Sequence, residues 1–186
     1  MVLDSRTLFT KAVRFQLERL DGLRDWQKWA HDEDLDHLRA MGGDEDEGIE
    51  FYADEAAVAS DTRDLADELA VVGLYRVVEH NTAKLIDQRL GAGTAQARAI
   101  YKWNKLRRLL KRQLNVDHKK LPCHDAVNEL RCVNNAVKHA GRVTKDLAAF
   151  GGWTRGDPLG ALGPVYDRLV PHVIEYLEAL ADSVLA

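Results

Sequence analysis

Six polar residues between positions 125 and 145 have the types and the spacing of an anion-binding surface. On a helix that advances about 100° per residue, they fall within one arc of about 100°, and apolar residues fill the opposite side. The arc contains Asn128, Arg131, Asn135, Lys138, His139 and Arg142. It has no carboxylate, although the whole chain has 30 Asp and Glu against 26 Lys and Arg. Such a face suits an anion, above all a phosphate, but a solvated helix face that is basic by chance explains the same pattern.

A second basic segment lies at residues 98–120, which contain nine Lys or Arg residues and one acidic residue, Asp117. Tyr101 and Trp103 are interleaved with the basic side chains, a combination that suits a polyanion carrying stackable rings. The residues expected to contact such a partner are Arg107, Arg108, Lys111 and Arg112. A solvated basic face is again the alternative.

Charge is distributed unevenly along the chain. Residues 1–70 contain 8 Lys or Arg and 19 Asp or Glu, whereas residues 71–186 contain 18 and 11. The second part is therefore the one expected to meet an anionic partner. The acidic part would shield that surface, repel other partners or keep the chain soluble.

Length and composition predict one globular domain over residues 1–186, with 46% hydrophobic and 30% charged residues. No apolar run is long enough to cross a bilayer, and Asp4, Arg6 and Lys11 interrupt the stretch that a signal peptide needs, so we expect a cytoplasmic protein without membrane contact. Cys123 and Cys132 form no CxxC pair, and we therefore expect neither a redox motif nor a zinc knuckle, and no metal or cofactor.

Helical periodicity predicts an all-α fold, an up-and-down bundle of four to five helices. The predicted helices cover residues 4–30, 51–90, 95–114, 125–145 and 164–184. Residues 31–50 are acid-rich and contain a Gly-Gly pair, which predicts a short polar helix and then a mobile acidic loop. Residues 151–163 contain five glycines and are expected to form either a flexible lid or a long connection.

Four single residues carry further structural expectations. Gly73, inside the second predicted helix, indicates the close approach of another helix, and Gly91 is expected to cap the C-terminus of that second helix. Asp125 is expected near the N-terminal cap of the central helix. Pro171 should kink the last helix or delay its start.

The segment ELRCVNNAVKHAG, residues 129–141, resembles the late helix of the HEPN superfamily. Members of that superfamily are small all-helical domains, and many are metal-independent endoribonucleases of prokaryotic toxin or phage-defence systems. Their signature is an Arg followed, after four to six positions, by a His, often within an Asn-x-x-Lys-His-Gly-like run. Arg131, Asn135, Lys138 and His139 carry the resemblance here.

The resemblance implies that an RNA 2′-hydroxyl attacks the adjacent phosphate. His139 would act as general base or acid, Arg131 would stabilise the phosphate charge, and Asn135 would orient the His or the scissile group. Further RNA contacts are expected from Lys138, Arg142 and Asn128 together with Arg107, Arg108, Lys111 and Arg112. Because HEPN sites are typically composite across a two-fold axis, a homodimer is implied, and an antitoxin or defence-system protein is an expected partner.

Two alternatives accompany this prediction. Seven residues separate Arg131 from His139, one more than the usual upper limit of the family, and Asn134 holds the position of the Arg in an Arg-Asn-x-x-x-His run. A HEPN-like module that binds RNA or protein and dimerises without cleaving is therefore the first alternative. The second is a metalloenzyme that uses Glu79, His80, His124 and His139, although the Glu-x-x-His pairs typical of that class are missing.

Overall fold

The computed structural model describes residues 4–41, 46–91 and 102–185, most of which lie in five α-helices. The helices are α1 (Ser5–Met41), α2 (Asp46–Leu90), α3 (Trp103–Gln113), α4 (His124–His139) and α5 (Gly163–Leu185). Two 3₁₀ turns, η2 (His118–Lys120) and η3 (Leu147–Ala149), flank α4. The described residues contain no β-strand, only an isolated bridge between Arg142 and Pro158, and the all-α prediction is confirmed.

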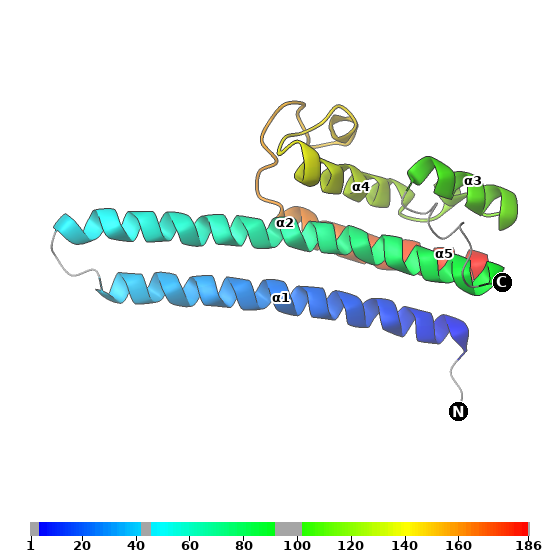
Figure 1. Ribbon diagram of the computed structural model, residues 1–186, viewed down its shortest axis with the longest axis horizontal. Helices are drawn as coiled ribbons and strands as arrows, with labels where there is room; N and C mark the ends of the chain where they lie inside the picture. The colour runs from blue at the N-terminus through cyan, green and yellow to red at the C-terminus, as the bar shows by residue number, and fades with distance from the viewer. Residues whose placement is uncertain (1–3, 42–45, 92–101, 186) are drawn as a thin grey trace.

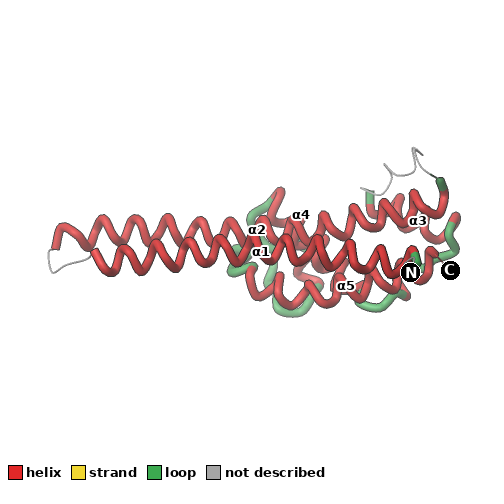
Figure 2. The backbone as a smooth tube through the Cα atoms, turned by 90° about the horizontal axis from the view of Figure 1, so that it is seen from below, coloured by secondary structure: helices red, strands yellow, loops and turns green. Residues whose placement is uncertain are grey.

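The two longest helices form an antiparallel hairpin (Figure 1). α1 has 37 residues and α2 has 45, whereas α4 has 16 and α5 has 23. α5 packs along both hairpin helices, and α4 packs on α2 and α5. Chain direction alternates through α1, α2, α4 and α5, as in an up-and-down bundle, and one end of the hairpin projects beyond α4 and α5 (Figure 2).

One apolar core fills the space between the four bundle helices. α1, α4 and α5 contribute the apolar faces that their periodicity predicts, whereas Leu65 and Leu69 of α2 are exposed. Side chains with at most 1% exposure come from every one of these helices: Val13, Val71, Leu74, Leu85, Ile86, Leu130, Val133, Leu169, Val173 and Leu177. Burying a side chain of this size stabilises the fold by about 1.5–3 kcal/mol. The core therefore fixes the angular position of α4, and with it the face that α4 turns outward.

An ion-pair network joins three helices near the start of α5. Arg24 of α1 donates from Nε to Asp67 of α2 at 2.7 Å, and its other guanidinium nitrogens bind Asp167 of α5. The guanidinium also lies 5.0 Å from the ring centroid of Tyr166, whose hydroxyl donates to Asp21 at 2.6 Å. Although burial opposes the charged form, the carboxylates of Asp167 and Asp67 raise the pKa of Arg24.

The prediction for residues 31–50 is a short polar helix followed by an acidic loop; the polar helix is confirmed, and the long loop is wrong. α1 continues to Met41 and α2 already begins at Asp46, while residues 42–45 lie outside the described part of the chain. Residues 31–41 contain no Pro or Gly, and Glu, Leu, Arg, Ala and Met favour a helix even when solvated. Low apolar content therefore does not predict a loop here; it indicates only that the helix is exposed.

The central helix ends earlier than predicted. α4 stops at His139, and Gly141 follows with φ +59° and donates its N–H to the carbonyl of Ala136 at 2.9 Å. A left-handed glycine after the last turn is a common helix ending, because no Cβ opposes that conformation. Arg142 is therefore on the following loop and not on the polar arc of the helix. At the other end the cap is Cys123, with Asp125 already inside the first turn.

Other local predictions agree with the structure. An added Cβ on Gly73 would lie 2.8 Å from Leu20 Cδ1, so α1 does approach α2 closely there. Gly91 follows α2 with φ +89° and donates to the carbonyl of Asp87, as expected of a C-terminal cap. Pro171 lies inside α5 and does not delay its start, which is at Gly163. The predicted helix start at residue 95 lies outside the described residues. The prediction of one continuous helix over residues 95–114 is wrong, because Lys102 has an extended backbone (φ −116°, ψ 98°) and α3 begins only at Trp103.

Candidate nucleic-acid interface

Within residues 98–120, the four basic residues that we expect to contact a polyanion all line one groove between α3 and η2. Leu106, Leu109 and Leu110 bury the apolar side of α3, which turns the basic side outward. The groove has a volume of about 1010 Å³. It is lined by Asn104, Arg107, Arg108, Lys111, Arg112, Asp117, His118 and Lys119. Five of these eight residues are Lys or Arg and one is acidic, so the groove is a favourable place for phosphate groups.

His118 forms part of the floor of the groove and packs against two further aromatic rings. The ring of His118 lies 5.2 Å from that of Trp103 and 4.8 Å from that of His124, and Trp103 lies 6.2 Å from His124. His118 is only 2% exposed, and its Nε2 atom is buried without a hydrogen-bond partner. Burial, together with the nearby His124 and Arg107, lowers the pKa of His118 to about 4. His118 is therefore a neutral ring at pH 7, placed beside the cations of the groove.

Arg131 connects the central helix to this cluster. Its Nε donates to Asn128 Oδ1 at 3.0 Å, and its Nη2 lies 3.3 Å from Cys132 Sγ. Its guanidinium carbon lies 5.4 Å from the ring centroid of Trp103, a cation–π contact between α4 and α3. Two predicted site residues, Asn128 and Arg131, are thus bonded to each other and joined to the floor of the groove.

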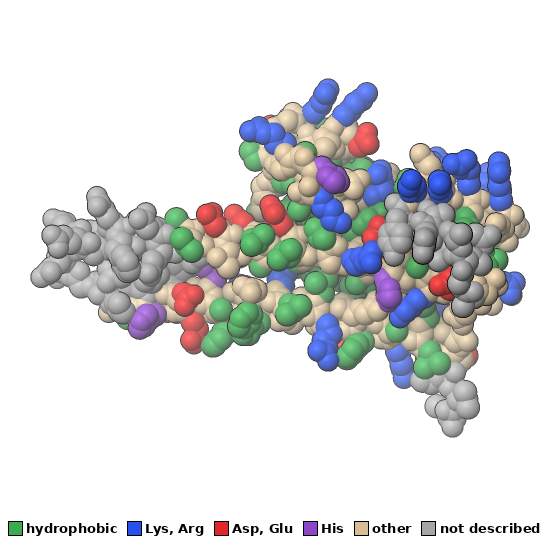
Figure 3. Space-filling view, in the orientation of Figure 1, with side chains coloured by type: hydrophobic (Ala, Val, Ile, Leu, Met, Phe, Trp, Pro, Cys, Tyr) green, Lys and Arg blue, Asp and Glu red, His purple; other side chains and the backbone are tan. Residues whose placement is uncertain are grey.

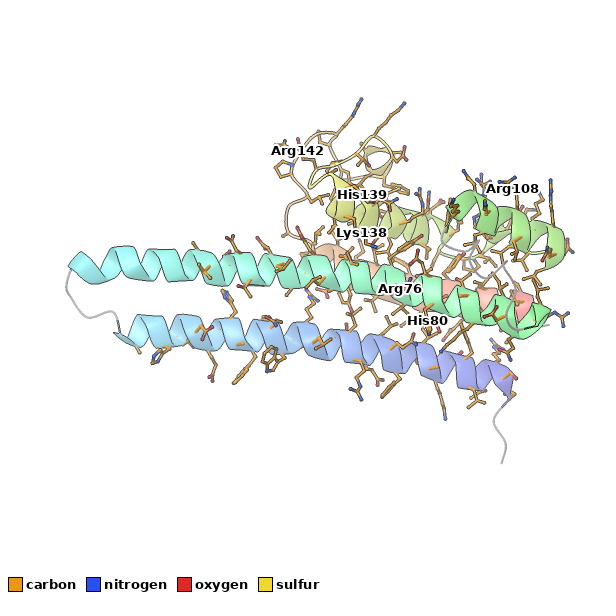
Figure 4. The ribbon with its side chains drawn as sticks, viewed as in Figure 1. Arg76, His80, Arg108, Lys138, His139 and Arg142 are labelled. Atoms are coloured by element: carbon orange, nitrogen blue, oxygen red, sulfur yellow. The ribbon has the colours of Figure 1, made fainter. Side chains whose placement is uncertain are left out.

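Asn135, Lys138 and His139 are exposed toward the other end of α4. Figure 4 shows Lys138 and His139 at that end, and Arg108 on α3 beside the opposite end. Eight residues of helix place Arg131 and His139 about 12 Å apart along the axis. Within the described part of the chain, no hydrogen bond joins Arg131, Asn135 and His139 to one another, and Arg131 faces Trp103. One chain by itself does not assemble the three residues that the resemblance implies as catalytic.

Arg142 holds the loop that follows α4. Its Nη1 donates to the carbonyl of Gly156 at 3.1 Å, and Val143 exchanges backbone hydrogen bonds of 2.8 and 3.0 Å with Asp157 and Gly156. Trp153 from the same loop donates to Glu129 Oε1 at 2.8 Å. The glycine-rich residues 151–163 are thus part of a folded connection, and Arg142 has a structural contact in addition to its exposed position.

Asn134, at the position of the expected family Arg, lies on the buried side of α4. It is 3% exposed, and its Oδ1 atom is buried without a partner. Its place in the helix packing is not one from which a side chain could contact RNA.

Basic side chains gather along one side of the molecule. Figure 3 shows them over α3, α4 and the loop after α4, with acidic side chains on the part of the hairpin that projects away. Arg76 and His80 of α2 lie on the same face, below α4 (Figure 4). Burial, and then Lys84 and Arg76, lowers the pKa of His80.

The metalloenzyme alternative named Glu79, His80, His124 and His139, and the structure does not gather them. Glu79 pairs with Arg76 at 3.3 Å, and His124 Nδ1 lies 3.0 Å from Asp125. Among the described residues, the one group of three His, Cys, Asp or Glu residues close enough to hold a metal is Cys123, His172 and Glu175. Sequence reasoning missed this group, since Cys123 and the two α5 residues are about fifty positions apart.

Fold and site together define an all-α helical bundle with a basic groove at one end. Comparisons with family models, with curated proteins and with solved structures find no match for the chain. Within the described residues, none of the helices combines the length and the apolar character needed to cross a bilayer.

Proposed function

We propose that this chain is a HEPN-like protein that binds RNA through the groove between α3 and η2. The observation that carries the proposal is the convergence of Arg107, Arg108, Lys111, Arg112 and Lys119 on one open groove. Closely spaced cations of this kind suit a phosphate backbone. The resemblance of residues 129–141 supports RNA as the nucleic acid.

α4 extends the proposed binding surface away from the groove. Arg131, held by Asn128 and Trp103, lies at the junction, and Asn135 and Lys138 follow on the exposed side of the same helix. None of these side chains forms an ion pair with a carboxylate among the described residues. A single strand that enters at α3 would therefore meet amide and cationic groups along α4.

Binding to a labelled single-stranded RNA, followed by fluorescence anisotropy over a range of salt, tests the proposal. The double variant Arg108→Ala/Arg112→Ala should weaken binding at least 10-fold and lower the salt slope by about 1.4, because each lost phosphate contact removes about 0.7 for a single strand. Lys105→Ala is the matched control, since Lys105 is exposed on α3 but does not line the groove. Equal losses in the two proteins, or no binding by the wild type, would refute the groove as the RNA site.

Metal-independent RNA cleavage is the second candidate function. The favouring observation is His139, exposed at the last residue of α4 beside the exposed Lys138, where an imidazole can exchange protons with a bound substrate. A second copy of the chain would have to place its own Arg131 beside His139, as in a composite site of a homodimer. The 2′-hydroxyl would attack the adjacent phosphorus and expel the 5′-oxygen, leaving a 2′,3′-cyclic phosphate.

Cleavage is tested with RNA in the presence of a chelator, with product ends identified. His139→Ala should abolish turnover while leaving RNA binding within about 3-fold, and His37→Ala, an exposed histidine of α1, is the control. If intact RNA remains after incubation with the wild type but anisotropy shows binding, the non-catalytic module is the function. An antitoxin or defence-system partner would then be expected to use the same RNA-binding face.

A further inference from the structure

Three donor atoms of different chemistry converge between the start of α4 and the middle of α5. Cys123 Sγ lies 3.4 Å from His172 Nδ1 and 3.1 Å from Glu175 Oε2, and the donor atoms of the three residues all lie within 4.8 Å of one another. Cys123 is the N-cap of α4, and His172 and Glu175 are one turn apart on α5. This Cys123–His172–Glu175 cluster has no role in the groove or on the polar face of α4.

The spacing fits a tetrahedral metal ion. Zn²⁺ binds Cys sulfur at about 2.3 Å and His nitrogen or carboxylate oxygen at about 2.0–2.2 Å, so neighbouring ligand atoms are roughly 3.4–3.6 Å apart. The separations from Cys123 Sγ, 3.4 Å to His172 and 3.1 Å to Glu175, are within a few tenths of an ångström of that range, and the third, between His172 and Glu175, is at most 4.8 Å. Small rotations of the side chains would complete the coordination geometry.

The backbone at Cys123 is also unusual. Its φ of 56° places a non-glycine residue in the left-handed region, a conformation that is unfavourable for a residue with a Cβ. The next residue, His124, packs on His118 and Trp103. The strained residue thus joins the cluster directly to the floor of the basic groove.

The arrangement does not suit a cysteine nucleophile. In a Cys–His–acid triad the carboxylate orients the histidine, whereas here Glu175 contacts the sulfur itself. Burial, and then the hydrogen bond to Glu175, raises the pKa of the Cys123 thiol to about 11. A divalent cation is the kind of ligand that would bind a thiolate, an imidazole and a carboxylate together.

We propose that Cys123, His172 and Glu175 form a Zn²⁺ site with an open fourth position for water. Thiolate and imidazole ligands favour zinc over magnesium or calcium, and three protein ligands are typical of zinc sites that keep a solvent position. The ion would link Cys123, the N-cap residue of α4, to α5 and so stabilise the position of the neighbouring His124 and of the floor of the groove. The inference rests on this cluster alone and is independent of RNA binding.

Titration of chelator-treated, reduced protein with Zn²⁺ and with Co²⁺ tests the site. We expect one equivalent to bind, and Co²⁺ to give a thiolate charge-transfer band. Cys123→Ser should abolish the band and weaken Zn²⁺ binding at least about 100-fold, since even outer-shell changes cost 10–100-fold. Cys132→Ala, which removes the other free cysteine, should leave both signals unchanged.

Two further measurements separate a metal site from a folding defect. Glu175→Gln should keep the cobalt band but weaken binding, while circular dichroism confirms that each variant is folded. Zn²⁺ at about 100 times its Kd should raise the Tm of the wild type by about 5–10 °C and that of Cys123→Ser by less than 2 °C. Absence of a thiolate band in the folded wild type, or a band that survives in Cys123→Ser, would overturn the proposal.

Discussion

At the residue scale, Glu129 is a buried carboxylate that the polar-arc prediction did not include. Its carboxylate accepts bonds from Arg168 at 2.7 and 3.0 Å and from Trp153 at 2.8 Å. Burial alone would raise the pKa of Glu129, but the bonds from Arg168 and Trp153 outweigh it and lower that pKa. The residue joins α4 to α5 and to the loop after α4.

Glu129→Gln should therefore destabilise the protein by about 2–4 kcal/mol, because Arg168 loses its charged partner. The contribution of Glu129 is fully present above its unfolded pKa of about 4.3, and it is lost as pH falls through the lower folded value. Urea unfolding at pH 7 and pH 3 measures both effects. Glu178→Gln, which removes the exposed pair with Arg14, should cost less than about 1 kcal/mol. Equal costs for the two variants would contradict the assignment.

His118 predicts a second pH effect with the same sign. Its folded pKa of about 4 is below the unfolded value of about 6.5, so the unfolded chain binds the proton first as pH falls. Stability should be unaffected above pH 7 and should decrease by about 1–3 kcal/mol between pH 6.5 and pH 4. The charged or titratable groups around the ring are His124, Arg107, Asp117 and Lys119.

The variant His118→Phe isolates that effect, since it keeps a ring against Trp103 and removes the titrating group. Its unfolding free energy should lose the pH dependence between 6.5 and 4 that the wild type shows, apart from the part due to carboxylates. Parallel curves for the two proteins would show that the pKa of His118 is the same in the folded and the unfolded state, which would contradict the prediction.

At the element scale, the sequence predicts that the helices exist but does not predict all of their ends. Apolar periodicity predicts the buried faces of α1, α4 and α5, because each of these helices uses one stripe for the core. It does not predict the buried face of α2, where Leu65 and Leu69 are exposed. The end of α4 was missed although Gly141 was visible, since a glycine ends a helix only when its φ becomes positive. The exposed continuation of α1 was missed because low apolar content does not distinguish a solvated helix from a loop.

The start of α5 depends on a glycine for space rather than for conformation. A Cβ on Gly163 would lie 2.5 Å from Asp67 Oδ2 and 2.8 Å from Arg24 Nη2. Gly163→Ala should disturb the network of Arg24, Asp67 and Asp167 and cost about 1–3 kcal/mol. Gly151→Ala, where a Cβ would meet nothing within 4 Å, should change stability by less than about 0.5 kcal/mol. Thermal unfolding compares the two, and equal Tm values would show that the network adapts.

At the scale of the whole molecule, charge and apolar surface are separated. The acid-rich residues 1–70 supply α1 and the first part of α2, while the basic groove lies on α3 and η2. An anionic partner is therefore attracted to the groove end and repelled by the hairpin. Composition predicted this polarity. It did not predict the Cys123–His172–Glu175 cluster, which exists only because the loop before α4 folds against α5.

The hairpin carries a different kind of surface. Leu23, Trp26, Leu65 and Leu69 are each more than half exposed and line one groove of about 370 Å³ between α1 and α2. Figure 3 shows hydrophobic side chains along the hairpin. The charged residue that lines the groove, Arg24, already pairs with Asp67 and Asp167. Such a surface marks contact with protein rather than with RNA.

If the chain forms the homodimer that the family resemblance implies, we expect this hairpin groove to be the interface, with the same face on both copies related by a two-fold axis. Leu65→Glu/Leu69→Glu would place two charges in each apolar groove and should raise the dimer Kd at least 100-fold, measured by sedimentation equilibrium. Leu8→Glu is the control, since Leu8 is also about half exposed (52%) but does not line the groove. A monomeric wild type, or equal weakening by both variants, would exclude this interface. If cleavage needs a composite site, the turnover of the double variant should fall in proportion to the fraction of protein that no longer dimerises. Its basic groove between α3 and η2 should still bind RNA.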